Sequence, residues 1–481
     1  MLKSLNQEIS GLASLMTPRP ESAEKGGAMK PLNDPKIPAR IVIIGGGSYN
    51  WAPTIVNDIL LTPSLNGSTI ILEDISPEPL KIIGELSRKM IADKGSDCRI
   101  RTTTDEAEAL QDADFVIVTI STGGFETMAN DLEIPARYGV NQTVGDTVGP
   151  GGLARALRSI PVLVNIAKHM EKQCPRAWLI NITNPMSTLC LAIKKTTKIK
   201  TIGLCHELQG VLFIVKSMVG LPETTKLDFT VAGVNHFIWL LRLSMNGRDG
   251  FQMLRQWSKN PTPFRVHDQD VKEMFAPSTI DHAKLKIELF KQLGYLPAAG
   301  DRHIVEFFEG YLKDVAQTEF RYQIKPTSIK ERGESWLAAM RAYVHGMLEG
   351  NFPLPHEKST ETISEILAAL AGGINPIIDV VNLPNTGQIK NLPNDCVVET
   401  LGTISLNSAE PCEPIGLPGP ICDLILPHAE NQSLIVQAAL GGDRSAALEY
   451  LRRDPLSRNS SNPKKMLDDL LLAHRRYLPQ F

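Results

Sequence analysis

The sequence predicts an α/β fold: a doubly wound parallel sheet with an interleaved, C-terminal α+β domain. The chain has 481 residues, which is long enough for two or more domains with cores of their own. In the first half, short β-branched runs alternate with amphipathic helical stretches, as is typical of a parallel sheet wrapped by helices on both faces. In the second half, strand-like segments precede long helical stretches instead.

The parallel half is predicted from its first element onward. RIVII, residues 40–44, is a β-branched run that leads into a glycine turn and a helix with apolar residues at helical spacing. STIILEDI, residues 68–75, is a second strand with a helix behind it. The pattern then repeats, with CRIRTTT and DFVIVTI as strands around a short helix, followed by the helix ARALRSIPVLVNIAKHMEK and the strand AWLIN. This succession predicts a sheet of the Rossmann type, as in lactate and malate dehydrogenases.

The character of the sequence changes past about Asn184. LDFTVAGVNHFIWLLRLSM is strand-like, whereas SIKERGESWLAAMRAYVHGMLEG and SLIVQAALGGDRSAALEYLRRD are helical, and NPKKMLDDLLLAHRRYLPQF is a terminal amphipathic helix. We therefore predict a flexible N-terminal extension at residues 1–38 and a nucleotide-binding Rossmann domain at residues 39–204. Residues 205–481 form an α+β domain for substrate, metal and oligomer contacts.

Composition excludes several classes of partner. Basic and acidic side chains nearly cancel, leaving a formal charge of −3, so nothing argues for nucleic acid or an anionic membrane surface. The seven cysteines are scattered and form no CxxC pair, which argues against a disulfide framework or a structural zinc site. Residues 1–39 lack the apolar region of a signal peptide, and no run approaches the ~20 apolar residues of a membrane span. We expect a cytoplasmic protein with a small-molecule ligand.

The glycine turn that follows the first strand predicts a dinucleotide site. It opens a helix, where bare amide groups at Gly45, Gly47 and Ser48 and the helix dipole can hold a pyrophosphate. The fingerprint is partial, because Asn50 stands where the third glycine would be. Asp74, at the end of the second strand, supplies a carboxylate for ribose hydroxyls and favours NAD over its 2′-phosphorylated form. The alternative is a structural α/β turn with a surface aspartate.

Cys205 and His236 are candidate metal ligands, but neither residue type establishes a metal site by itself. A buried free cysteine is more often part of a core, and a lone histidine in an apolar strand usually has a backbone partner. The surroundings favour a site, because Asn181 and Asn184 in NITNP lie at the end of a sheet strand. That edge of the sheet is where ligands bind in this architecture.

Eight motifs in order make the chain similar to glycoside hydrolase family 4, the NAD- and manganese-dependent glycosidases. The resemblance covers about residues 39–450, and its most specific part is the combination of GLCHE with GVNH. In that family the cysteine and histidine of these two motifs hold the metal, so the resemblance implies that Cys205 and His236 are ligands of Mn²⁺ or another divalent cation. The motifs are GGGSYNWAP, LEDI, DFVIVTI, DTVGPGG, NITNP, GLCHE, GVNHFIWL and NLPNTGQIKNLPNDCVVE.

The resemblance implies a redox-assisted elimination rather than the usual pair of flanking carboxylates. NAD takes hydride from C3 of the sugar, a base removes the acidified C2 proton, the bond from C1 to the leaving group breaks, water adds, and the hydride returns. In LGYLPAAGDRHIVEFF, Asp301 matches the base position, with Tyr295 as the alternative. A metal that binds vicinal sugar hydroxyls would polarise them as a Lewis acid.

Three more polar residues receive roles from the same resemblance. Asp146 in GDTVGPGG matches an acidic position that tunes the base, and Asn184 matches a substrate-binding asparagine. His206 follows the metal cysteine, where phosphosugar-cleaving relatives carry a carboxylate acid. Histidine can donate a proton near neutral pH, so His206 is the candidate acid, with a metal-positioned water as the alternative. Each residue could instead make an ordinary surface hydrogen bond or cap.

The sequence CHE differs from the pattern that phosphosugar-cleaving relatives carry at this point, which favours an unphosphorylated substrate. The sequence around CHE resembles the α-galacturonidase branch of the family. A uronic acid carries a C6 carboxylate, which an arginine fork can bind. Arg302 and Arg321 are the candidates, although both could simply pair with nearby acids. An α-glucosidase, an α-galactosidase or a sulfoquinovosidase remains an alternative.

Two other classes are open to the same fold. One is a hydroxy-acid dehydrogenase, which would accumulate NADH and need no thiolate ligand. The other is a nucleotide-sensing protein that binds NAD and turns nothing over. We favour the glycosidase because of its site residues rather than its fold, and we expect a homodimer or homotetramer.

Overall fold

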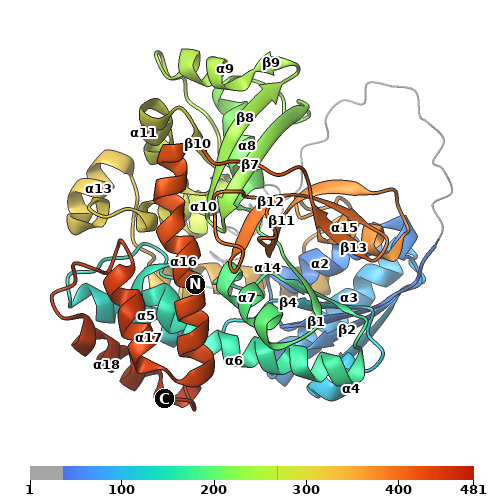
Figure 1. Cartoon of the computed structure of the whole chain (residues 1–481). Coiled ribbons are helices and arrows are strands. Elements are labelled where there is room, and N and C mark those ends of the chain that lie inside the picture. Colours follow the sequence, from blue (N-terminus) through green and yellow to red (C-terminus); the bar gives the residue numbers. More distant parts are fainter. Residues whose placement is uncertain (1–35, 268) are drawn as a thin grey trace.

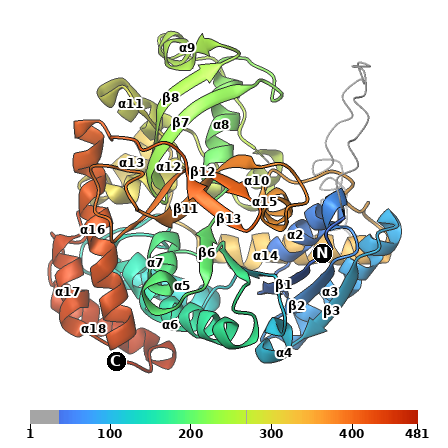
Figure 2. The same cartoon turned by 45° about the vertical axis from the view of Figure 1, so that its right-hand side comes forward.

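The computed structural model describes residues 36–267 and 269–481, and its backbone is organised around one mixed sheet (Figures 1 and 2). The predicted extension at residues 1–38 lies outside the described residues except at its C-terminal end. The strand order is β10-β8-β7-β12-β11-β6-β5-β4-β1-β2-β3, with β13 beside β12 and β9 beside β8. The described parts of the chain contain no helix with the length and apolar composition needed to cross a bilayer.

Six parallel strands form the nucleotide-binding half of this sheet, and their order, β3-β2-β1-β4-β5-β6, is that of a Rossmann fold. Central strands β1 and β4 are buried along nearly their whole length, which explains their continuous apolar sequences. The predicted fold class is therefore confirmed. The strands are β1 (Arg40–Ile44), β2 (Thr69–Glu73), β3 (Arg99–Thr103), β4 (Phe115–Val118), β5 (Trp178–Asn181) and β6 (Lys200–Gly203).

The sheet does not end at β6 but continues into an antiparallel part supplied by the second half of the chain. β11 pairs antiparallel with β6, β12 with β11 and β7, and β7 with β8. The ribbon of β7 and β8 projects away from the parallel half in both views (Figures 1 and 2). These strands are β7 (Leu227–Val234), β8 (Phe237–Met245), β9 (Arg248–Asp249), β10 (Leu296–Pro297), β11 (Ile377–Pro384), β12 (Val397–Ser405) and β13 (Ser408–Pro411).

Two hydrophobic cores lie on opposite faces of the parallel strands, as the alternation along β1 requires. Val42 and Ile44 pack into the core covered by α6, α7, α16, α17 and α18, whereas Ile41 and Ile43 pack into the core covered by α2, α3, α14 and α15. Helices from both halves of the sequence thus cover each face, which interleaves the two halves. The segment SLIVQAALGGDRSAALEYLRRD, which was predicted to be helical, forms parts of two helices, because Gly442 ends α16 in a left-handed conformation.

The helices have these bounds: α2 (Trp51–Leu60), α3 (Pro77–Lys94), α4 (Glu106–Leu110), α5 (Gly124–Ala136), α6 (Gly149–Gln173), α7 (Met186–Thr196), α8 (Glu207–Met218), α9 (Gly250–Trp257), α10 (Gln269–Phe275), α11 (Lys284–Leu293), α12 (Asp301–Ile304), α13 (Val315–Tyr322), α14 (Leu337–Glu349), α15 (Ile363–Ala371), α16 (Gly419–Gly441), α17 (Arg444–Arg453) and α18 (Pro463–His474). Short 3₁₀ turns include η3 (Val305–Phe307), and a π-helical turn, η5 (Glu331–Trp336), leads into α14.

Candidate active site

The nucleotide turn is shaped by glycines that no larger residue could replace. Gly45 has φ +92°, and a Cβ on it would lie 2.0 Å from the carbonyl oxygen of Thr119. The amides of Gly45 and Gly46 donate to the carbonyl of Glu73 at 3.0 and 2.7 Å, which fixes the turn at the carboxyl end of β2. Gly45 is therefore required by the close packing of the protein's own backbone. The amides of Gly45, Gly47 and Ser48, predicted to be bare, donate to Glu73, Asp74 and Gly45, so pyrophosphate binding at this turn stays a prediction.

Asp74 lies beside this turn, where the sequence places the ribose-binding carboxylate. Its Oδ2 accepts from the amide of Gly47 at 3.0 Å, and its Oδ1 accepts from the amide of Ser76 at 2.9 Å. Ser48 accepts from the amide of Trp51 at 3.1 Å, at the start of α2. Gly45, Gly47, Ser48 and Asp74 thus come together as one cradle, and the part each takes in nucleotide binding stays a prediction.

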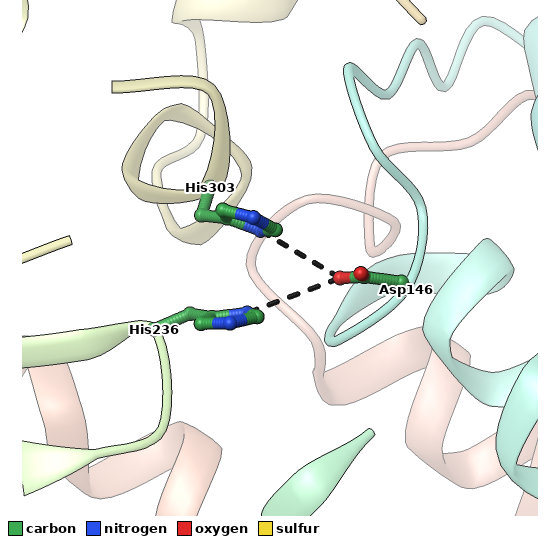
Figure 3. A group of neighbouring side chains, drawn as sticks. All are labelled: Asp146, His236 and His303. Atoms are coloured by element: carbon green, nitrogen blue, oxygen red, sulfur yellow. Dashed lines mark ion pairs between the residues drawn. The ribbon is translucent and has the colours of Figure 1, made fainter. Parts of the chain in front are cut away.

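The centre of the candidate site is a cluster of one carboxylate and two imidazoles, Asp146, His236 and His303 (Figure 3). One potential ligand atom from each residue lies within 4.8 Å of the others. Oδ1 of Asp146 lies 3.9 Å from Nδ1 of His236 and 3.6 Å from Nδ1 of His303. The two rings face each other with centroids 3.9 Å apart. Neutral imidazole and carboxylate are ligands that suit Mn²⁺ and related divalent cations.

His236 is held in place by the turn between β7 and β8. Its backbone has φ +63°, a left-handed conformation that a side chain with a function often occupies. Oγ1 of Thr147 lies 2.7 Å from Nδ1 of His236. An imidazole whose Nδ1 bonds to a neighbouring oxygen presents Nε2 to a metal.

The charges of the cluster are those of a cation site. Burial raises the pKa of the Asp146 carboxyl, but His303, His236 and Arg155 outweigh it and hold that pKa well below its usual range. Burial and the neighbouring His303 lower the pKa of His236 to about 3. The cluster therefore presents an ionised carboxylate beside a neutral imidazole, the protonation states that metal binding needs.

Two buried polar atoms at the cluster have no hydrogen-bond partner among the described residues. They are Nδ1 of His303 and Oδ1 of Asn184. The amide nitrogen of Asn184 donates to Oδ2 of Asp146 at 3.2 Å, so the unpaired amide oxygen lies beside the same carboxylate. Buried polar groups are rarely left unpaired, and a cation, water or sugar hydroxyl at this point would pair both. The residues present thus fit a divalent cation.

Cys205 lies outside this cluster, between the end of β6 and the start of α8. The backbone amide of Glu207 and the side-chain amide of Asn235 face its sulfur, and Asn235 directly precedes His236. Burial, with Glu399 and Glu207 nearby, raises the pKa of the Cys205 thiol well above its usual value. A thiol in these surroundings ionises only beside a cation. Its place as a metal ligand stays a prediction.

Asp301 is buried with its carboxylate turned to the start of α11. It accepts from the amides of Leu285 and Lys286 at 2.8 and 3.0 Å and from Nζ of Lys286 at 2.9 Å. Burial raises its pKa to about 6, although Lys286 opposes that shift. Tyr295 packs between two hydrophobic clusters. Neither side chain belongs to the Asp146 cluster, so a base role for Asp301 would require it to leave these donors.

His206 lies on the nucleotide side of the cluster. Its ring centroid is 5.5 Å from that of Trp51, in the helix after the glycine turn. Nδ1 lies 3.7 Å from a carboxylate oxygen of Glu361, and Nε2 lies 3.9 Å from one of Glu207. Its side chain is half exposed. This position is open to a leaving group, and the acid role stays a prediction.

The two predicted arginines have other partners. Arg302 donates to the carbonyl of Thr143 at 3.2 Å and to the hydroxyl of Thr327. Arg321 lies on the surface of α13, where it pairs with Glu288 at 2.6 Å. The structure brings neither guanidinium into the Asp146 cluster, and their binding of substrate stays a prediction.

Sequence reasoning missed three residues of the site, His303, Glu306 and Glu207. Nε2 of His303 lies 3.8 Å from Glu207, whose carboxylate accepts from the amide of Gly300 at 2.6 Å. Glu306 accepts from the amides of residues 143, 144 and 145 at 2.6, 2.5 and 3.0 Å, and so fixes the loop that leads to Asp146. The signal was present in GDRHIVEFF and GLCHE, which concentrate charged and ring side chains in otherwise apolar surroundings.

Curated relatives match nearly the whole chain. An α-galacturonidase of Lachnoclostridium phytofermentans is 34% identical over 459 residues, which are 92% of this chain and 97% of that protein. An α-galacturonidase of Thermoanaerobacter italicus is 34% identical over 457 residues, 91% of this chain and 97% of that protein. An α-galactosidase of Bacillus subtilis is 32% identical over 452 residues, 92% of this chain and 99% of that protein.

Solved structures share the fold. The structure of lplD from Bacillus subtilis is 30% identical and covers 90% of this chain and all of that chain, with a TM-score of 0.80. A 6-phospho-α-glucosidase from gut microorganisms, solved with NAD and Mn²⁺, is 18% identical and covers 92% and 100% of the two chains, with a TM-score of 0.76. Residues 40–221 match the family 4 glycosyl hydrolases, and residues 231–457 match the C-terminal domain of the same family. The predicted resemblance is confirmed: the chain belongs to the family 4 glycosyl hydrolases, and it is a glycoside-hydrolysing enzyme.

Proposed function

We propose that this enzyme hydrolyses α-galacturonides with NAD and a divalent metal ion. The observation that carries the proposal is the cluster of Asp146, His236 and His303. Asn184, which donates to Asp146, follows β5 at the carboxyl edge of the parallel strands, the edge where the glycine turn follows β1. A metal and a nicotinamide held next to each other can act on one sugar ring. The two α-galacturonidases among the relatives support the substrate.

The glycine turn and Asp74 fit NAD. The glycine turn between β1 and α2 has the place in the fold at which dinucleotides bind, and Asp74, just after β2, would accept from ribose hydroxyls. A carboxylate at that point repels a 2′-phosphate, which favours NAD. Bound NAD supplies the reversible oxidation of the sugar at C3.

Asp146, His236 and His303 would hold the metal, with Cys205 as a further ligand if its thiol ionises. A divalent cation supplies Lewis-acid polarisation of the sugar hydroxyls and stabilises negative charge at C2 and C3. Asn184 can bond a sugar hydroxyl through its unpaired amide oxygen.

The chain's own groups then move two protons. One leaves C2 of the sugar for a base, and the other reaches the glycosidic oxygen as the bond to C1 breaks. His206, half exposed between Trp51 and Glu361, is positioned to donate at the leaving group. Asp301 is the predicted base, and His303 competes for that role if the cation leaves its Nδ1 free. Water then adds at C1 and a proton returns to C2, so that with the reversal of the oxidation at C3 the net reaction is hydrolysis.

The test is a panel of p-nitrophenyl α-glycosides, including the galacturonide, the galactoside and the glucoside, with and without NAD and Mn²⁺. We expect release of nitrophenol from the galacturonide only with both cofactors, and solvent deuterium at C2 of the released sugar. Cleavage that persists without nicotinamide, or a product without the label, would contradict the mechanism.

An α-galactosidase is the second candidate, because the Bacillus subtilis α-galactosidase is 32% identical over a similar length. Galactose and galacturonic acid differ only at C6, so the groups that face C6 decide between them. A higher kcat/KM for the galactoside in the same panel would favour this second candidate.

A further inference from the structure

We propose that Arg155 and Arg332 form the fork that binds the C6 carboxylate of the sugar. The proposal rests on the proposed function and names the residues that select a uronic acid. It is an alternative to the predicted pair of Arg302 and Arg321, whose guanidiniums have other partners.

Arg155 lies on the second turn of α6, which begins three residues after Asp146. It is half-buried, and among the described residues it makes no hydrogen bond or ion pair. Arg158, one turn further along α6, is by contrast an arginine with a structural role. It is buried against Asp131, with a bond of 2.8 Å to Oδ1, and it also donates to the carbonyl of Thr122 at 2.9 Å.

Arg332 lies on the π-helical turn η5, and its segment is tied to the loop that carries Asp146. The amide of Thr327 donates to the carbonyl of Thr143 at 2.7 Å. The charge of the neighbouring Glu331 acts on Arg332, but its carboxylate accepts from the amide and hydroxyl of Ser278 at 3.0 and 2.8 Å. Within the described ranges, the half-buried guanidinium of Arg332 has no hydrogen bond or ion pair. π-helical turns are frequent at functional sites.

The charges of Arg155 and Arg332 both act at Asp146. Burial lowers the pKa of Arg332, Asp146 opposes that shift, and Arg155 adds to it. Arg155 also lowers the pKa of Asp146. Both side chains are therefore close enough to Asp146, and Arg332 close enough to Arg155, for their charges to interact.

Arg155 and Arg332 have no ion-pair partner within the described residues, so their charges favour an anion beside the Asp146 cluster. The nearby carboxylates are committed, since Asp146 lies between two imidazoles and Glu207 accepts from Gly300 and faces His303. A guanidinium that loses water without gaining a partner is costly, whereas a carboxylate can accept from it bidentately. A sugar whose hydroxyls lie on the metal would supply that carboxylate from C6.

The experiment compares kcat/KM for p-nitrophenyl α-galacturonide and α-galactoside in the wild type, Arg155→Met and Arg332→Met, with NAD and Mn²⁺ present. We expect each substitution to lower kcat/KM for the galacturonide by about 100-fold, and to lower it at least ten times more than for the neutral galactoside. Arg332→Lys keeps the charge but not the fork, and should recover part of the loss. Arg242→Met, which removes an exposed guanidinium paired with Asp228, is the matched control.

Two kinetic outcomes overturn the fork. One is an equal loss on both substrates, and the other is a larger selective loss in Arg321→Met than in Arg332→Met. Titration of D-galacturonate and D-galactose into the wild type and Arg332→Met, followed by calorimetry, tests the fork without turnover. A wild type that cleaves no galacturonide refutes the proposed function, while a selective loss of galacturonate binding in Arg332→Met still supports the fork. Equal binding of galacturonate by both proteins overturns it.

Discussion

The nucleotide cradle and the metal cluster are built in opposite ways. The cradle is local in sequence, because Gly45, Ser48 and Asp74 come from two consecutive strands and the helix between them. The cluster draws Asp146, His236 and the segment after β10 from three distant parts of the chain. A local site depends on backbone conformation, whereas an assembled one depends on the packing that brings its parts together. The two should therefore fail independently.

Loss of a ligand from the cluster should give the largest effect. His236→Ala removes an imidazole whose position Thr147 fixes. We expect kcat to fall by about 10³-fold, because Lewis-acid stabilisation is worth several kcal/mol. EDTA should act similarly on the wild type and be reversed by Mn²⁺. Calorimetry should show NAD affinity within about twofold of the wild type, and an equal loss of NAD binding would remove the contrast between the two sites.

Asp301→Asn tests whether that residue serves structure or chemistry. Its carboxylate accepts from Lys286 and from the start of α11, so we expect the free energy of unfolding to fall by about 3–5 kcal/mol, as for other broken buried pairs. Denaturant titration measures this loss. In the double variant with Lys286→Met much of it should be recovered. Unchanged stability combined with loss of deuterium exchange at C2 would instead identify Asp301 as the base.

Gly45→Ala is the matching test of the cradle. The new Cβ would approach the carbonyl oxygen of Thr119 to 2.0 Å, in a backbone conformation with φ +92°. We expect NAD affinity to fall by about 100-fold, since strain of this kind costs about 1–3 kcal/mol and also displaces the amides. Mn²⁺ binding, followed by paramagnetic resonance, should be unchanged. Gly441→Ala is the control, because a methyl group on Gly441 would meet nothing within 4 Å.

Glu306→Gln should give the smallest effect of the four. The substitution replaces one acceptor oxygen by an NH₂ group that cannot accept from the amides of residues 143–145. We expect affinity for Mn²⁺ to fall by about 10-fold, as for other partners that support metal ligands. A shifted Mn²⁺ resonance spectrum would show altered ligand geometry. A loss of stability with normal Mn²⁺ binding would contradict a positioning role.

This contrast also explains what the sequence could predict. The Rossmann order and the glycine turn follow from local periodicity and from turn chemistry, and both were predictable. His236 was found because its motif is specific. His303 was missed although it stands two residues from Asp301, because no sequence rule says which side of a short helix faces a loop 157 residues earlier. Arg302 was predicted because it stands beside Asp301, and Arg321 because its segment resembles a substrate-binding position of the family. Their other partners, Thr327 for Arg302 and Glu288 for Arg321, come from distant segments that no local pattern reveals.

The segment Asp301–Phe307 has a consequence for attempts to alter the enzyme. Within two turns it anchors α11 through Asp301, faces the metal cluster through His303 and secures the opposite loop through Glu306. Random substitution of this segment would cause folding defects and catalytic defects together. The activities of such variants would therefore be difficult to interpret. Diversity is better introduced at residues 328–333, where Glu331 is bonded to Ser278 and the guanidinium of Arg332 has no hydrogen bond or ion pair within the described residues.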